Sequence, residues 1–177
     1  MTARFIFLVL LGFIWFTGEA QRFDRVYKMD GYQSKEVIQT QDGGYALVGH
    51  RQIEDDKANP FILKTDSNGD PIWLFESNSY QKYYGISIAE TSNADFILAC
   101  AVKDTLEDYG LYIARVSISG DILWFNYMPQ YRVSTNYISV LKENSVDEYI
   151  IAANTWDQNH QFLQNKIDGN GNEIWQK

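Results

Sequence analysis

The 177-residue chain contains a single cysteine, Cys100, so no disulfide bond can form within it. Small secreted domains without a sufficient apolar core are commonly held together by several disulfides. This chain must therefore be stabilised by the packing of its core. Cys100 lies in the apolar run FILACA, where a buried thiol behaves as a small hydrophobic side chain.

The chain also lacks an excess of positive charge. Its 15 Lys and Arg residues are outnumbered by 23 Asp and Glu residues, which gives a net charge of −8. The field of an acidic protein repels phosphate groups. Nucleic acid is therefore not an expected partner.

Long apolar runs are absent except at the beginning of the chain. Arg4 precedes an uncharged apolar run at residues 5–16, and small residues follow it up to Ala20. This layout is typical of a secretory signal peptide, so we expect residues 1–20 to be removed and residues 21–177 to form an extracellular or periplasmic domain. An uncleaved membrane anchor is the alternative, although the run is short for a bilayer-spanning helix. No membrane span is expected after cleavage.

Motifs for covalent catalysis are absent as well. There is no Gly-x-Ser-x-Gly turn, and the two histidines, His50 and His160, have no metal-ligand spacing. The sequence favours a protein that is not an enzyme and that uses no cofactor.

The sequence does contain one pattern that occurs three times. The stretches KTDSNGDPIW, RVSISGDILW and KIDGNGNEIW each end in a tryptophan, and successive tryptophans are 51 residues apart. Each stretch also has a glycine four residues before the tryptophan. The residues of this structural repeat are Gly69, Trp73, Gly120, Trp124, Gly171 and Trp175. A fixed period of this length indicates a repeat architecture.

Each copy contains four short apolar, β-forming runs separated by turn residues, and no helical period of useful length. Four-stranded units of about fifty residues are typical of propeller blades. We therefore predict an all-β, propeller-like fold of three consecutive four-stranded antiparallel blades of about 51 residues. The expected ranges are about 34–78, 85–128 and 136–177, with an extra N-terminal strand at 22–33 in an incomplete ring.

The tryptophans have a structural interpretation in such a fold. A blade cannot bury both faces of its small sheet alone, so neighbouring blades pack face to face and a large flat side chain fills each junction. The alternative interpretation is that Trp73, Trp124 and Trp175 form a ladder that stacks on sugar rings.

The first copy carries a more specific pattern. The stretches SKEVIQTQDGGYALVGH and FILKTDSNGDPIW combine Asp-Gly-Gly-Tyr with Lys-x-Asp-x-x-Gly-x-x-x-Trp. The matching residues are Thr40, Asp42, Gly43, Gly44, Tyr45, Gly49, Lys64, Asp66, Gly69 and Trp73. This pattern resembles the blade repeat of secreted β-propeller proteins that are abundant in Bacteroidetes. The resemblance implies a fold and a location outside the cytoplasm, and it implies no particular reaction.

The other two copies match that family's pattern less well. The second has TSNAD in place of the Gly-Gly turn and Arg115-Val116-Ser117 in place of Lys-x-Asp. The third retains Lys166, Asp168, Gly171 and Trp175 but has NSVDEY at the turn.

Three blades are fewer than propellers typically have. Three explanations compete: a fragment of a longer protein, an open three-blade arc, or a homo-oligomer in which N-terminal strands complete neighbouring blades. An open arc exposes an apolar face and strand edges, which favours association.

Candidate site residues fall in two groups. The turn with Asp66, Asn68 and Asp70 has the alternating oxygen ligands of a calcium loop but no following bidentate Glu, so it is a weak metal candidate and an ordinary tight turn explains it equally well. The second group lies in the loops that differ most between copies: Glu54, Asp55, Asp56, Asp104, Glu107, Asp108 and Trp156. Variable loops on a rigid scaffold are a usual place for recognition.

We therefore expect a secreted, non-catalytic binding or assembly module whose partner is a protein or a glycan. One alternative is a component of a secreted carbohydrate-binding or hydrolytic system, with the loop carboxylates and Trp156 at its site. The other is a truncated fragment of a longer surface protein.

Overall fold

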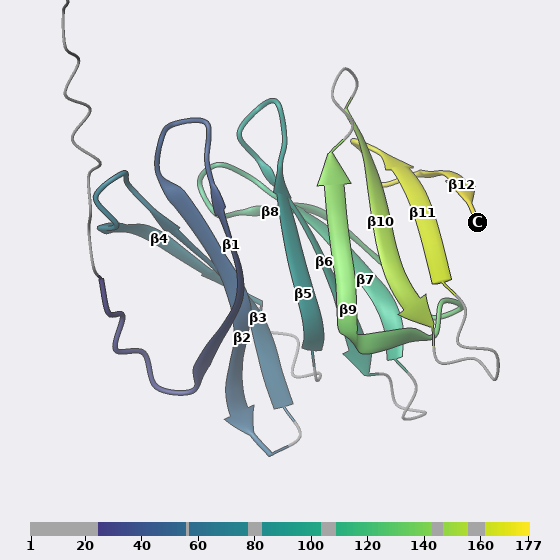
Figure 1. The fold of residues 1–177 in the computed structure, drawn as a ribbon, viewed down its shortest axis with the longest axis horizontal. Helices are drawn as coiled ribbons and strands as arrows, with labels where there is room; N and C mark the ends of the chain where they lie inside the picture. Colours follow the sequence, from purple (N-terminus) through teal and green to yellow (C-terminus); the bar gives the residue numbers. More distant parts are fainter. Residues whose placement is uncertain (1–24, 56, 78–82, 104–108, 143–146, 156–161) are drawn as a thin grey trace, which may run out of the picture.

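The computed structural model describes residues 25–177 except 56, 78–82, 104–108, 143–146 and 156–161. The expected signal peptide, residues 1–20, lies outside the described residues. The described chain is all-β and forms three four-stranded antiparallel sheets side by side (Figure 1). The prediction of a propeller-like fold of three consecutive four-stranded blades is thus confirmed.

Each sheet is a meander in which strands adjacent in sequence are hydrogen-bonded neighbours. Blade 1 consists of β1 (Tyr32–Gln39), β2 (Tyr45–Glu54), β3 (Lys57–Thr65) and β4 (Pro71–Glu76). Blade 2 consists of β5 (Tyr83–Glu90), β6 (Phe96–Lys103), β7 (Tyr109–Val116) and β8 (Ile122–Met128). Blade 3 consists of β9 (Val133–Lys142), β10 (Glu148–Thr155), β11 (Phe162–Asp168) and β12 (Glu173–Gln176).

Two apolar cores join the three blades. One lies between blades 1 and 2 and includes Val48, Ile62, Phe96 and Leu98, all fully buried. The other lies between blades 2 and 3 and is built from the opposite face of blade 2. Strands β6 and β7 of blade 2 are buried on both faces, and this explains why they read as continuous apolar runs rather than alternating ones, whereas the outer strand β8 is largely exposed.

The repeated tryptophan connects each blade to the next. The indole Nε1 of Trp73 donates to the carbonyl oxygen of Ile118 at 2.8 Å, and that of Trp124 donates to Gly169 at 3.0 Å. Ile118 and Gly169 occupy the same place in successive β3–β4-type turns, 51 residues apart. The junction is therefore repeated as well as the blade.

A glycine in the turn allows the indole ring to approach the turn closely. A Cβ atom on Gly120 would stand 3.2 Å from the Trp73 ring, and one on Gly171 would stand 2.7 Å from the Trp124 ring. Gly171 also has a φ of +80°, a conformation that side chains with a Cβ rarely adopt. The conformation of the turn and the close approach of the indole therefore both require glycine.

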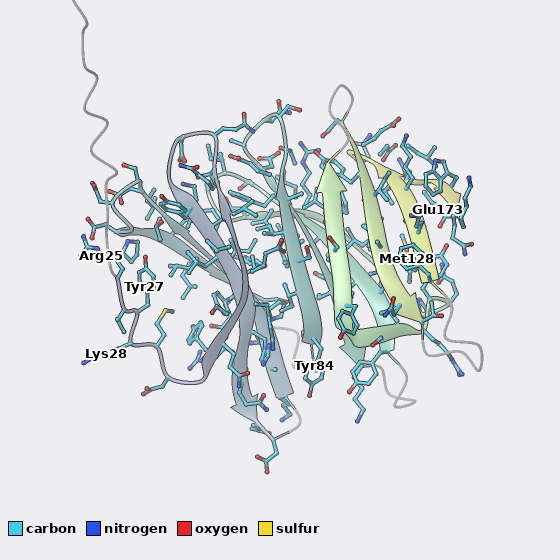
Figure 2. The ribbon with its side chains drawn as sticks, in the orientation of Figure 1. Arg25, Tyr27, Lys28, Tyr84, Met128 and Glu173 are labelled. Carbon is cyan, nitrogen blue, oxygen red and sulfur yellow. The ribbon has the colours of Figure 1, made fainter. Side chains whose placement is uncertain are left out.

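The extra N-terminal strand expected at 22–33 is not formed in the described part of that range. Residues 25–31 form no strand, and Tyr32 and Gln33 already belong to β1. A lone outer strand needs inner strands of its own blade for pairing, and the described chain provides none there. The segment instead runs along the outer face of blade 1, where Tyr27 donates to the carbonyl of Gly69 at 2.6 Å and Arg25 pairs with Asp70 at 2.9 Å (Figure 2).

Candidate functional site

The loop carboxylates that the sequence singled out are only partly described. Glu54 and Asp55 lie at the end of blade 1 and are exposed, and Glu54 forms a 2.7 Å surface ion pair with Lys57. The other members of that group, Asp56, Asp104, Glu107, Asp108 and Trp156, lie outside the described residues. The described part of these loops therefore brings no two carboxylates together as an acid–base pair.

The weak metal candidate is a hydrogen-bonded turn in the structure. The Oδ1 atom of Asp66 accepts the backbone amides of Asn68 and Asp70, both at 2.8 Å. The Asp70 amide contributes most to the lowered pKa of Asp66. Within the described ranges, no three His, Cys, Asp or Glu side chains are grouped as a metal ion would need.

The same turn recurs in the other blades. Asp168 accepts the amides of Asn170 and Asn172 at 2.9 and 2.8 Å, and in blade 2 the hydroxyl of Ser117 accepts the amide of Asp121 at 3.0 Å. A serine can take the place of the aspartate because the turn needs only one side-chain oxygen acceptor. This recurrence accounts for Asp66 as a turn residue.

A different surface, the outward side of blade 3, has the features of a binding site. Alternate residues of a strand point to opposite faces. Tyr149, Ile151, Ala153 and Leu163 face blade 2 and are buried in the second core. Their strand neighbours face away from blade 2 and form what we call the open face of blade 3: Tyr137, Ser139, Ile150, Ala152, Asn154, Phe162, Gln164, Lys166 and Trp175.

The corresponding positions of blade 2 can be identified from strand pairing. Ile150 pairs with Lys166, and Lys166 pairs with Trp175. In the same way Ile97 pairs with Arg115, and Arg115 pairs with Trp124. The next two rows of blade 3 are Ala152 with Gln164 and Asn154 with Phe162, and they correspond to Ala99 with Ile113 and Ala101 with Leu111.

Blades 2 and 3 use these positions differently. In blade 2 all four of those side chains are apolar and fully buried against blade 3. In blade 3 two of the four are amides, Asn154 and Gln164, and the aromatic Phe162 is 58% exposed. The open face thus differs at these positions from the junction of blades 2 and 3.

The open face also repeats features of a junction. In blade 1 the place of Asn154 is taken by the buried His50. Ser139 occupies the place of Ser87, which accepts the Val140 amide across the blade 2–3 junction.

An irregularity of the inner strand shapes this face. Val133 pairs with Thr155 and Ile138 pairs with Ala153, so residues 134–137 of β9 lie opposite the single residue Asn154. Blades 1 and 2 have smaller register shifts on their inner strands, between Ser34 and Glu36 and between Tyr84 and Ser87. Bulges re-aim side chains and are frequent next to functional sites.

A hollow of about 240 Å³ lies at this irregularity. Tyr137 from β9, 67% exposed, and Phe162 from β11 are two of its walls. The side chains around it belong to Tyr137, Ile138, Ser139, Ala152, Ala153, Asn154 and Phe162. Among the described residues around the hollow there is no Asp, Glu, Lys or Arg.

A second hollow, of about 220 Å³, shares the Phe162 ring. Its other side chains include Tyr131 and Arg132 from the linker before β9 and Gln176 at the end of β12. Tyr131 donates to the carboxylate of Glu173, which lies at the outer edge of blade 3 and is labelled in Figure 2. Phe162 therefore stands between two depressions on one side of blade 3.

The outward side of blade 1 is covered to a greater extent. A smaller hollow of about 120 Å³ lies there, and Tyr27 and Met29 of the N-terminal segment are among its walls. Phe61 and Leu63 beneath are each only 4% exposed. Blade 1 thus has part of the chain over its outer side, whereas Tyr137 and Phe162 of the open face are exposed.

The residues of the open face were not identified from the sequence. A signal was nevertheless present, because the third copy places Asn154 and Gln164 where the second has Ala101 and Ile113. Reading that signal requires the strand register, and the third copy is shifted by extra residues in its β9–β10 turn. The open face was therefore not recognised because the strand register of the third copy was unknown, although its amide side chains stand in the sequence.

Comparison with known proteins adds little to this description. No protein-family model and no curated protein sequence matches the chain. Among solved structures, one similar chain is a protein of unknown function from Bacteroides caccae, with 10% identity, a TM-score of 0.49 and coverage of 84% of this chain. Another is the Pan2 WD40 domain of Neurospora crassa, with 11% identity, a TM-score of 0.44 and coverage of 82%. This chain spans 47% and 50% of their respective lengths.

Proposed function

We propose that the chain is a non-catalytic binding module and that its binding surface is the open face of blade 3. In this proposal residues 1–20 direct export, and residues 21–177 act outside the cytoplasm as one repeat domain. A helix both long enough and apolar enough to span a bilayer is not found among the described residues.

One observation carries the proposal: the open face has exposed aromatic and amide side chains at positions that are apolar and buried in blade 2. Aromatic rings bury a large area when they bind a partner and are frequent energetic anchors of binding sites. Amides beside them provide donors and acceptors that fix the orientation of a ligand.

The amides of Asn154 and Gln164 can donate and accept hydrogen bonds, so we favour a ligand with hydrogen-bonding groups for this face.

The proposal can be tested by titrating the isotope-labelled full chain and following its backbone amide resonances. Three probes cover three chemistries: methyl β-glucopyranoside, N-acetyl-leucinamide and inorganic phosphate. We expect at least one of the two neutral probes to shift the amides of Ser139, Ala152, Asn154 and Phe162, and phosphate to leave them unchanged.

Two results would overturn the proposal. In one, neither neutral probe shifts these four amides at millimolar concentration. In the other, the largest shifts occur on a different blade, which would place the binding surface elsewhere.

A further inference from the structure

The hollow between Tyr137 and Phe162 has a composition that restricts its ligand. We infer that it binds a single neutral pyranose ring of a glycan. This inference rests on the proposed binding role of the open face and names the ligand class for it.

Size is the first restriction. A cavity of about 150 Å³ accepts benzene, and pockets for drug-sized ligands begin at about 300 Å³. The hollow, at about 240 Å³, lies between these two values. It therefore has room for one six-membered ring with its substituents, and a longer ligand would have to continue over the surrounding surface.

Charge is the second restriction. None of the seven described side chains around the hollow carries a charge at neutral pH, and the chain as a whole has a net charge of −8. A phosphate, sulfate or carboxylate would find no cation among these seven side chains and would be disfavoured by the net negative charge of the chain. A metal ion would find no carboxylate ligand among these residues. The described residues of the hollow thus favour a neutral ligand.

The arrangement of aromatic and polar groups is the third restriction. Tyr137 and Phe162 come from the two strands that flank β10, and Asn154, which pairs directly with Phe162, comes from β10 itself. Asn154 and Ser139 are both exposed. The hollow thus has aromatic side chains on both sides and a carboxamide and a hydroxyl at its polar part.

A pyranose matches this arrangement. Its ring presents a face of C–H groups that packs on the electron-rich face of an aromatic ring, and its rim carries hydroxyl groups. The Asn154 amide can donate to one hydroxyl and accept from another, and the Ser139 hydroxyl can do either. An aliphatic side chain of a peptide would fill the volume but would make no hydrogen bond with Asn154 or Ser139.

The neighbouring row of the open face extends the site. Gln164 pairs with Ala152, directly beside the hollow, and Trp175 lies one row further on. A second sugar unit linked to the first would therefore meet another amide and another aromatic side chain. This predicts tighter binding of disaccharides than of the corresponding monosaccharides.

The experiment compares three forms of the full chain by calorimetry and amide-resonance titration with methyl β-glucopyranoside, cellobiose and N-acetyl-leucinamide. The forms are the wild type, Phe162→Ser and Phe125→Ser. Phe125 is a matched control because it is 60% exposed but lies on β8 in blade 2. Both substitutions remove one exposed aromatic ring, so a general effect on folding or solubility would appear in both.

We expect at least one of the two sugars to bind the wild type and to shift the amides of Ser139, Ala152 and Asn154. Its affinity should fall at least tenfold in Phe162→Ser and less than twofold in Phe125→Ser, and Phe162→Tyr should restore it. An equal loss in both serine variants would overturn the assignment of the hollow.

The remaining outcomes separate the inference from the proposed function. If neither sugar binds but N-acetyl-leucinamide shifts the same amides, the pyranose assignment is wrong and the open face remains a binding surface for a peptide. If none of the three probes shifts these amides, both the inference and the proposed function are wrong.

Discussion

The indole of Trp124 packs on Gly171 so closely that a Cβ atom on that glycine would stand 2.7 Å from the ring. The pair joins the outer strand of blade 2 to the β11–β12 turn of blade 3, and the Trp124 indole also donates to Gly169 of the same turn. Trp73 and Gly120 repeat the relationship one blade earlier. The stability of the arc therefore depends on contacts that cross from blade to blade.

Gly171→Ala should destabilise the chain more than Gly43→Ala. Both glycines have positive φ, +80° and +83°, but a Cβ on Gly43 would meet nothing within 4 Å. We expect about 1–2 kcal/mol for the conformational strain at Gly43 and at least 1 kcal/mol more at Gly171, where the indole must also move. Urea unfolding of the two variants gives the difference directly. Equal losses would show that the indole does not pack on the turn.

Arg115 should be the most sensitive charged residue of the described chain. It is 8% exposed and its guanidinium contacts Asp95 of its own blade at 3.0 Å, Asp147 of blade 3 at 2.9 Å and the Gly169 carbonyl at 2.7 Å. Removing one partner of a buried ion pair leaves an uncompensated charge, which typically costs about 3–5 kcal/mol.

Arg115→Ala should therefore lower the free energy of unfolding by up to about 3 kcal/mol, because Asp95 is left largely buried without its cation while the Asp147 side chain is 42% exposed to water. Lys57→Ala is the control, because its ion pair with Glu54 is exposed and should contribute less than about 1 kcal/mol. Chemical unfolding monitored by tryptophan fluorescence measures both. A small loss at Arg115, similar to that at Lys57, would mean that blades 2 and 3 are not held together by this cluster.

Acid should weaken the fold partly through Asp42. A hydrogen bond from the buried Lys64 ammonium, together with one from Thr40, lowers the pKa of Asp42 to about 2. Because this pKa is lower in the folded chain than in the unfolded chain, the contribution of Asp42 is complete above its unfolded value of about 3.9 and is lost as the pH falls towards 2.

Asp42→Asn should therefore destabilise the chain most at pH 5 and above, where the wild type has the ion pair. The difference between the two proteins should shrink between about pH 4 and pH 2. Unfolding measured across this range provides the comparison. A difference that stays constant with pH would show that the Asp42 carboxylate gains nothing from Lys64 in the folded state.

Cys100 should be unreactive in the folded chain. The thiol is fully buried between blades 1 and 2, and burial raises its pKa well above the ordinary value, so it has almost no thiolate at neutral pH. A chromogenic disulfide reagent should label it only when urea unfolds the chain. Fast stoichiometric labelling of the native protein would mean that the first core is open to solvent.

The sequence predicted most of the architecture because its turn signals are local. The turn glycines and the tryptophans four residues later recur at a fixed spacing, and that spacing directly specifies three equivalent strand pairs. The N-terminal segment was predicted less well. A strand was expected at 22–33, but a strand needs a hydrogen-bonded neighbouring strand, and Tyr27 contacts a turn of blade 1 instead.

The candidate site was predicted least well, for a physical reason. Loop carboxylates stand out in a sequence, but Glu54 is accounted for by a surface ion pair with Lys57. Tyr137, Asn154 and Phe162 look like ordinary strand residues until the register brings them to one face. Such a face either packs on another blade or is open to solvent. Which of the two holds depends on what lies opposite the face, and no local sequence pattern gives that information.

The most direct test of the binding account is hydroxyl-radical footprinting of Tyr137, Phe162 and Tyr149 with and without cellobiose. Tyr149 is fully buried and serves as the internal reference. The account predicts fast oxidation of Tyr137 and Phe162 in the free chain, slow oxidation of Tyr149, and protection of the first two by the sugar. If Tyr137 and Phe162 are as protected as Tyr149 without ligand, or equally exposed with and without it, the account is contradicted.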